Sequence, residues 1–197
     1  MKKYYAVREG RVPGVYETWA ECKAQTDGYS GAAYKSFVSR AEAVRFVCGA
    51  AEETPAADGA RAAAYVDGSY NIRTGEFGCG AVLFYGGETR EFSQKFEDAE
   101  LAAMRNVAGE IKGAEIVLAY CRDNNIPAVD IYYDYEGVAA WAEGRWKTNK
   151  DGTRAYKEFF DGVKSAVNTR FVKVKGHSGD KYNDRADRLA KDAVGNA

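Results

Sequence analysis

Residues Ala62 to Tyr70 read AAAYVDGSY, a run of small and apolar residues that ends in an acid, a glycine and a serine. A short apolar run of this kind predicts a buried strand. An ionised Asp67 inside such a strand needs a partner charge, a hydrogen-bond network or a metal ion to offset its desolvation. Asp-Gly-Ser is also ordinary turn chemistry, which is the simpler interpretation of these residues taken alone. The rest of the sequence decides between the two.

The composition is that of a globular protein for which we expect a cytoplasmic location. Of the 197 residues, 46% are hydrophobic and 29% are charged. No apolar run reaches the roughly 18 residues that a membrane helix needs, and the N-terminal MKKYYAVREGR lacks the apolar core of a signal peptide. The four cysteines form no Cys-x-x-Cys pair, which argues against a zinc site and favours reduced thiols.

The first segment, residues 1–48, predicts a small and basic β-β-α-β-α domain. It holds eight Lys and Arg against five Asp and Glu, which suggests a polyanionic partner. The expected elements are strands over 3–8, 14–19 and 34–38 and helices over 20–25 and 40–48, the second helix starting at a Ser39-Glu42 capping box. Residues 49–60, GAAEETPAADGA, contain no large apolar residue and predict a flexible linker.

The second segment, residues 61–197, predicts an α/β three-layer domain on a mixed sheet. In order, we expect strands over 62–70, 77–85 and 88–96, a helix over 99–124, a strand over 128–134, helices over 136–142 and 154–167, a strand over 170–175 and a helix over 180–194. The long helix has one apolar stripe, formed by Met104, Val107, Ile111, Ala114, Leu118 and Cys121.

Three further acids stand where the pattern does not call for a charge. Glu110 lies about 60° from the centre of the apolar stripe, and Asp187 borders the buried stripe of the last helix. Asp134 ends the fourth strand, at the edge where open α/β sheets bind ligands. Each has an ordinary interpretation: a solvated acid for Glu110, a helix cap for Asp134 and an ion pair with Arg185 or Lys191 for Asp187.

The topology brings these acids together. A right-handed crossover places the strand that ends at Asp134 beside the strand that carries Asp67, with Glu110 on the helix above. Carboxylates gathered in one place repel each other unless cations neutralise them. Hard oxygen ligands select Mg²⁺ or Mn²⁺, and two such ions about 4 Å apart serve in-line displacement at a phosphodiester.

The segments YVDGS, NVAGE, YYDYEG and VKGHSGDKYNDRADRLA, in this order over residues 62–195, resemble type 1 ribonuclease H. The resemblance implies an endonuclease that hydrolyses the RNA strand of RNA/DNA hybrids without sequence preference, leaving 3′-hydroxyl and 5′-phosphate ends. It implies that two Mg²⁺ ions, or Mn²⁺ in their place, are held by Asp67, Glu110, Asp134 and Asp187. Asp184 is a rival of Asp187, but the spacing and the ADRLA context favour Asp187.

The resemblance also assigns roles outside the four acids. His177 is the only histidine; a lone histidine is more often structural, but its Gly-flanked loop suits the implied role in proton transfer and product release. The implied RNA or DNA contacts are made by Asn71, Arg105, Asn106, Trp146, Lys147 and Asn183. Arg105 stands where the family commonly has Thr, so phosphate binding there would differ chemically.

Trp146 and Lys147 belong to EGRWKTNKDGTRAYK, residues 143–157, which carries five basic side chains. Taken alone, this stretch reads as a solvated helix and loop. The resemblance implies a basic protrusion that holds the DNA strand through phosphate contacts and aromatic packing.

YAVR, GVY, TW and YKSF, in this order between Tyr4 and Val47, resemble the hybrid-binding domain found at the N-terminus of many such enzymes and in a caulimovirus protein. The residues carried over are Tyr5, Arg8, Trp19, Tyr34 and Lys35, the aromatic ones on sugars and the cations on phosphate. Ser36 replaces a lysine common in the family, which predicts weaker, less salt-sensitive binding. The alternative is that Trp19 and Tyr34 join Phe37 in the small core.

The combined expectation is a ribonuclease H-like domain with a five-stranded mixed sheet, preceded by a small α+β hybrid-binding domain. The expected partner is an RNA/DNA hybrid, with double-stranded RNA as a second ligand of the N-terminal domain; we expect a monomer and no membrane partner. A non-catalytic hybrid-binding protein is a rival, which the presence of all four acids opposes. A transposase or integrase core is another, but it would lack the N-terminal segment and the KGHSGD loop.

Overall fold

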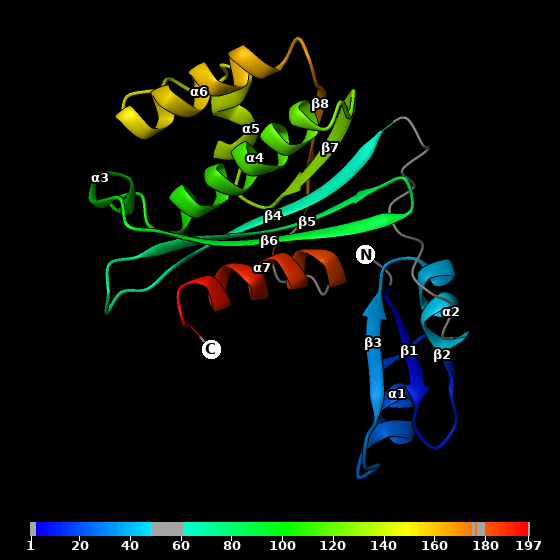
Figure 1. The fold of residues 1–197 in the computed structure, drawn as a ribbon. Helices are drawn as coiled ribbons and strands as arrows, with labels where there is room; N and C mark the ends of the chain where they lie inside the picture. Colours follow the sequence, from blue (N-terminus) through cyan, green and yellow to red (C-terminus); the bar gives the residue numbers. More distant parts are fainter. Residues whose placement is uncertain (1–2, 49–60, 175, 177–179, 197) are drawn as a thin grey trace. The chain divides into compact units, whose positions relative to one another are not determined.

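The computed structural model describes residues 3–48, 61–174, 176 and 180–196. The chain divides into two compact units, Met1–Thr54 and Pro55–Ala197, which are coloured along the sequence in Figure 1. The predicted linker, residues 49–60, and His177 lie outside the described residues. No helix of the described part is long and apolar enough to cross a membrane.

The first unit has the predicted β-β-α-β-α order. Its elements are β1 (Tyr4–Glu9), β2 (Gly14–Tyr16), α1 (Trp19–Thr26), β3 (Ala33–Phe37) and α2 (Arg40–Cys48), with the antiparallel sheet order β2-β1-β3. The prediction that the second strand continues to Trp19 is wrong. Thr18 instead caps α1, because its hydroxyl accepts the backbone N–H of Glu21 at 3.3 Å while the Glu21 carboxylate accepts from the Thr18 backbone N–H.

The second unit is built on the predicted mixed sheet. Its strands are β4 (Ala62–Tyr70), β5 (Phe77–Tyr85), β6 (Glu88–Phe96), β7 (Ala128–Tyr133) and β8 (Asn168–Lys173), in the order β6-β5-β4-β7-β8. The first three pair antiparallel, whereas β7 runs parallel to both β4 and β8. The chain therefore makes the expected crossover, and β4 and β7 are neighbours in the middle of the sheet.

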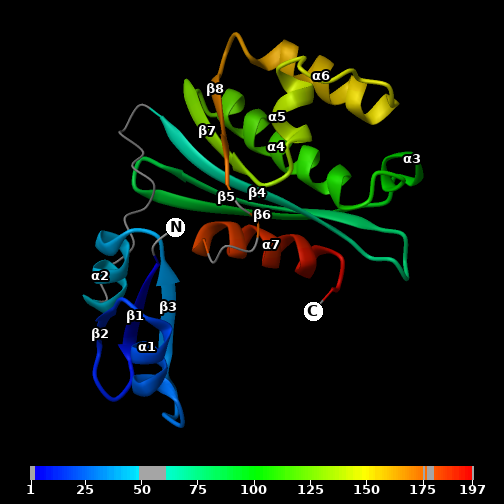
Figure 2. The ribbon, with the colours of Figure 1, turned by 180° about the vertical axis from the view of Figure 1, so that it is seen from behind.

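Helices cover both faces of this sheet, which gives the three layers. They are α3 (Ala99–Ala102), α4 (Asn106–Asp123), α5 (Gly137–Ala142), α6 (Asp151–Val163) and α7 (Lys181–Ala193). Figures 1 and 2 show α4, α5 and α6 on one face and α7 on the other. The predicted apolar stripe is confirmed within α4, because Ile111, Ala114 and Leu118 are buried in the main core. Its first member, Met104, is buried too but lies before α4 begins.

The single long helix predicted over 99–124 is wrong, because the chain breaks between α3 and α4. Arg105 has a φ of 54° and a ψ of −133°, a backbone conformation that no α-helix contains. The helix over 154–167 is also misplaced, since α6 runs from Asp151 to Val163. Its start is fixed by Thr153, whose hydroxyl accepts the backbone N–H of Lys150 at 3.2 Å.

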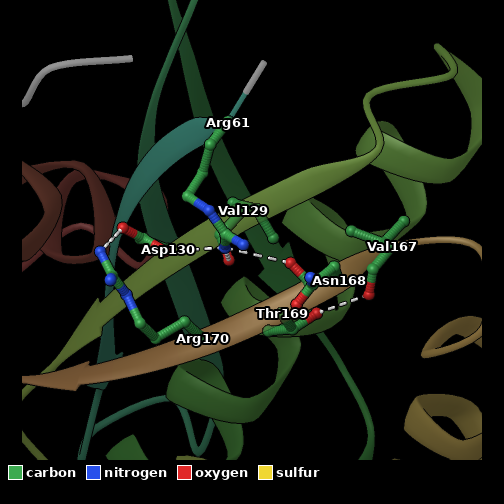
Figure 3. Close-up of polar contacts among 7 residues, drawn as sticks. All are labelled: Arg61, Val129, Asp130, Val167, Asn168, Thr169 and Arg170. Carbon is green, nitrogen blue, oxygen red and sulfur yellow. Dashed lines mark hydrogen bonds and ion pairs between the residues drawn. The ribbon is translucent and has the colours of Figure 1, made fainter. Parts of the chain in front are cut away.

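A buried acid that the sequence did not single out, Asp130, lies on β7. Arg61 donates to its Oδ1 at 2.9 Å, and Arg170 of β8 pairs with its Oδ2 (Figure 3). Arg61 also donates to the carbonyl oxygens of Val129 and Asn168, at 3.4 and 3.2 Å. Two guanidinium groups therefore compensate this carboxylate, and they tie the start of β4 to β7 and β8.

Candidate metal centre and nucleic-acid contacts

Asp67, Glu110 and Asp134 form one cluster, which we call the three-carboxylate centre. Asp67 lies inside β4, Glu110 in the first turns of α4, and Asp134 directly after the C-terminal end of β7. One carboxylate oxygen of each lies within 4.8 Å of those of the other two. Glu110 is only 2% exposed, so the centre reaches into the core between sheet and helix.

Burial and electrostatic repulsion disfavour the charged forms of Asp67 and Glu110. Burial, followed by the charges of Asp67 and Asp134, raises the pKa of Glu110 to about 9. The pKa of Asp67 is raised to about 7, first by burial and then by the charge of Asp134, although the Gly68 N–H donates to its Oδ1 at 2.7 Å. In contrast to Asp130, these acids have no cation bonded to them among the described residues.

The donor set fits a hard divalent cation. Oε2 of Glu110 is buried and has no hydrogen-bond partner within the described part of the chain. A buried, unpartnered carboxylate oxygen is costly unless a ligand satisfies it. Three carboxylates that offer only oxygen suit Mg²⁺ or Mn²⁺ rather than a softer metal.

Asp187 lies near this centre but outside the group of three. Its Oδ2 accepts from Lys191 Nζ at 2.7 Å, which is one of the ion pairs that the sequence allowed. Its charge nevertheless raises the pKa of Asp67, so the two carboxylates lie close enough to interact. The rival Asp184 is exposed. That Asp187 is a fourth ligand remains a prediction.

Lys173 is a residue near the centre that the sequence reasoning missed. Its Nζ donates to the backbone carbonyl of Asp134 at 3.1 Å and pairs with Glu136 at 3.2 Å. Its charge also lowers the pKa of Glu110, against the larger effect of burial. The signal was weak, because Lys173 stands between Val172 and Val174 like any solvent-facing strand residue.

Two predicted nucleic-acid contacts are buried in the described structure. Asn71 donates from Nδ2 to the carbonyl oxygen of Val194 at 2.8 Å, and its Oδ1 accepts the backbone N–H of Arg73 at 2.9 Å. Contact to nucleic acid through this amide would require those bonds to break. Asn183 is 3% exposed, and its Oδ1 has no partner within the described residues.

Other predicted contacts of the second unit lie on the surface. Arg105 and Asn106 are exposed where α4 begins, and Lys147 is exposed beyond α5. Trp146 is partly exposed and packs edge-on against Trp141, with ring centroids 5.7 Å apart. A nucleic acid can therefore reach these four side chains without a rearrangement of the protein.

In the first unit, the prediction that Trp19 and Tyr34 lie outside the core is confirmed. They are 46% and 47% exposed. The ring of Trp19 lies 5.8 Å from that of Tyr5 and 5.7 Å from that of Tyr34, so the three form one aromatic surface. Phe37 packs instead on Phe46, at 5.5 Å.

The two predicted cations of this unit stand apart from the aromatic surface. Arg8 lies over the ring of Phe46 at 5.2 Å, and Lys35 over the ring of Phe37 at 5.7 Å. Neighbouring residues of a strand point to opposite faces, so Lys35 and Tyr34 flank different sides of β3.

Both units are similar to known protein families. Residues 60–195 match the family model described as RNase H, and residues 3–47 match that of the ribonuclease H1 N-terminal domain. Rat ribonuclease H1 is 25% identical over 256 aligned positions, covering 97% of this chain and 89% of the rat protein. Ribonuclease H of Idiomarina loihiensis is 36% identical over 138 positions, covering 66% of this chain and 85% of that protein.

The match to a yeast enzyme covers a shorter stretch. Ribonuclease H of Saccharomyces cerevisiae is 57% identical over 44 residues, which is 22% of this chain and 13% of that protein.

Solved structures show the same fold for the second unit. RNase H1 from Halobacterium salinarum superposes with a TM-score of 0.58 at 24% identity, covering 70% of this chain and 99% of that one. The structure of LC11-RNase H1 in complex with an RNA/DNA hybrid gives a TM-score of 0.54 at 16% identity, covering 68% and 99%. The family model spans well over half of the chain, and so the protein belongs to the ribonuclease H family of nucleases.

Proposed function

We propose that the protein hydrolyses the RNA strand of RNA/DNA hybrids at the three-carboxylate centre. The observation that carries the proposal is the centre itself, in which oxygens of the buried Glu110, of Asp67 and of the half-buried Asp134 lie within 4.8 Å of one another on a ribonuclease H fold. Curated relatives are named for this activity, and one solved structure of similar fold holds an RNA/DNA hybrid. Hydrolysis would leave 3′-hydroxyl and 5′-phosphate ends.

In this mechanism Asp67, Glu110 and Asp134 would hold two divalent ions at the site where the scissile phosphate binds. When bound, Mg²⁺ or Mn²⁺ lowers the pKa of a water molecule and stabilises charge on the leaving oxygen. Asp187 would be a further ligand, which would require its ion pair with Lys191 to open. Burial of Glu110 keeps bulk water away from the inner side of the centre. His177 is proposed to move a proton to the leaving group.

The aromatic surface of the first unit is proposed to bind the hybrid. Exposed aromatic rings can pack on sugars and bases regardless of sequence. Shape recognition of this kind reads the 2′-hydroxyls of the shallow minor groove rather than base edges. Double-stranded RNA, which offers the same hydroxyls, is proposed as a weaker second ligand.

The proposal is tested by offering matched labelled duplexes of one sequence with Mg²⁺. We expect cleavage of the RNA strand in RNA/DNA, and none of the DNA strand, of RNA/RNA or of DNA/DNA. A ligase joins only 3′-hydroxyl to 5′-phosphate ends. Religation of the cleaved RNA by such a ligase would therefore support the proposed product ends. Cleavage that is equal in DNA/DNA and RNA/DNA, or that persists unchanged in excess EDTA, would contradict the proposal.

Replacing Trp19 by Ala should weaken hybrid binding without slowing the chemical step. Loss of one aromatic platform costs about 1–3 kcal/mol, so we expect a Kd about ten times higher, with single-turnover cleavage at saturation unchanged. Fluorescence anisotropy and quenched-flow cleavage measure the two. Tyr29→Ala is the control, because Tyr29 is 43% exposed in the same unit but makes no ring contact with the aromatic surface. An equal loss in both variants would argue against the aromatic surface.

A further inference from the structure

Two strands beside the three-carboxylate centre, β4 and β5, contact the helices α4 and α7 at glycine residues. Gly68 follows Asp67 in β4, and Gly80 is the residue of β5 that pairs with Asp67. Figures 1 and 2 show α4 and α7 crossing opposite faces of these strands. Because glycine has no side chain, the backbone of a helix can touch a strand directly at such a position.

On the α4 side, Gly68 touches the turn that carries Glu110. A Cβ atom on Gly68 would lie 2.5 Å from the backbone nitrogen of Glu110 and 2.9 Å from the carbonyl carbon of Gly109, and it would overlap the carbonyl oxygen of Asn106. Gly109 faces back towards the sheet, where a Cβ atom would lie 2.8 Å from Gly68 Cα. No side chain therefore separates β4 from this turn of α4.

On the α7 side, Gly80 touches the turn that carries Asp187. A Cβ atom on Gly80 would lie 2.5 Å from the backbone nitrogen of Ala190 and 2.8 Å from Leu189 Cβ, and it would overlap the carbonyl oxygen of Ala186. The contact is again made by helix backbone, which cannot move aside as a flexible side chain can.

These close approaches determine how far two acids lie from Asp67. Carbon atoms in contact are ordinarily about 3.5–4.0 Å apart, so a methyl group on either glycine would push its helix outwards by about 1 Å. The interior is close-packed and transmits such a shift to the side chains of the displaced turn. A metal site tolerates only about 0.5 Å of displacement in its ligands.

We propose that Gly68 and Gly80 are positioning residues for the metal centre. Gly68 sets the distance of Glu110 from Asp67, Gly80 sets that of Asp187, and together they set the affinity for divalent cations. The inference rests on the proposed function, because it takes the centre to bind such cations.

The test compares Mn²⁺ binding by the full chain and by its Gly68→Ala and Gly80→Ala variants, using titration calorimetry. We expect the Kd for Mn²⁺ to rise at least about tenfold in each, since a shift of about 1 Å is costly at such a site. Gly113→Ala is the matched control on α4, because its Cβ would lie 3.3 Å from Val66 Cβ and meet no backbone atom closer than 3.6 Å. Its Kd should stay within about twofold of wild type.

Two further variants separate positioning from a general loss of stability. Val117→Ala removes a fully buried side chain from α4, about 10 Å along the helix from Glu110; it should unfold at lower urea with its Kd for Mn²⁺ unchanged. Adding Asp187→Glu to Gly80→Ala should restore much of the affinity, because the longer side chain reaches back across the added distance. A merely destabilised protein would not be rescued in this way.

The other possible results also support or overturn the positioning role of Gly68 and Gly80. If the two alanine variants do not fold, Gly78→Ala replaces them, since its Cβ would meet Ala193 Cβ and Val194 Cγ1 at 2.9 Å; about threefold weaker binding is then expected. Wild-type affinity in folded glycine variants, or an equal loss in Val117→Ala, would overturn the positioning role. Failure of the wild-type chain to bind Mn²⁺ or Mg²⁺ would instead overturn the proposed function.

Discussion

Asp67→Asn should abolish cleavage of the hybrid and yet make the metal-free protein harder to unfold. Removing a ligand should slow cleavage by more than the roughly hundredfold that outer residues of metal sites contribute. The opposite effect on stability follows from the pKa of Asp67, which is about 7 in the folded protein against an ordinary value of 3.8. Each unit of that difference is about 1.4 kcal/mol, so we expect the free energy of unfolding at pH 8 in EDTA to rise by about 2–4 kcal/mol.

Asp130→Asn is the matched control for this prediction. It makes the same chemical change in a buried acid of the neighbouring strand, but Asp130 pairs with Arg61 and Arg170. Breaking such pairs leaves guanidinium groups without their partner, so the variant should lose about 1–3 kcal/mol of stability while still cleaving. Urea unfolding in EDTA and single-turnover cleavage measure both variants. An Asp67→Asn protein that is less stable than wild type, or that cleaves within tenfold of it, would contradict the account.

The metal-free wild-type protein should lose stability as the pH rises from about 5 to about 9. The folded-state pKa values of Asp67 and Glu110 are raised, to about 7 and about 9. At a pH below the unfolded-state pKa values of the two acids, both carboxyl groups are protonated in the folded and in the unfolded protein, so the folded state carries no penalty. Between the unfolded and folded values the folded state holds more protons, so its stability falls with rising pH.

The fall should exceed the roughly 2–4 kcal/mol that we expect for Asp67 alone, because Glu110 adds to it. Saturating Mg²⁺ should remove most of the fall, because bound cations favour the ionised acids. Glu110→Gln should flatten the profile above pH 7. Urea unfolding curves recorded in EDTA and in Mg²⁺ across this range provide the measurement. A stability that rises steadily to pH 9 in EDTA would show that the acids are already compensated within the protein.

The sheet and the three-carboxylate centre could be predicted because both depend on local pattern and crossover handedness. Asp67 ends an apolar run, Asp134 ends another, and the right-handed connection makes their strands neighbours. The helix break was not predictable, because Arg105 is a good helix former and its positive φ is imposed by the surrounding structure.

Other parts of the centre depend on contacts between distant residues, which no local pattern records. Lys173 reaches the carbonyl of Asp134 from another strand. The contact of Gly68 with Gly109 joins a strand to a helix, and in the sequence both look like ordinary interruptions of a pattern. Residues of this kind are identified only when the packing is seen.

The central claim is that at pH 7 Glu110 is largely protonated and Asp67 partly protonated until divalent cations bind. It is tested most directly by calorimetric titration with Mn²⁺ at pH 7 in two buffers of different ionisation enthalpy, which counts the protons released. Because the pKa values are about 7 and about 9, we expect about one proton or more per protein, and fewer from Asp67→Asn. Tight binding of Mn²⁺ by the wild-type protein with no release of protons would contradict the claim.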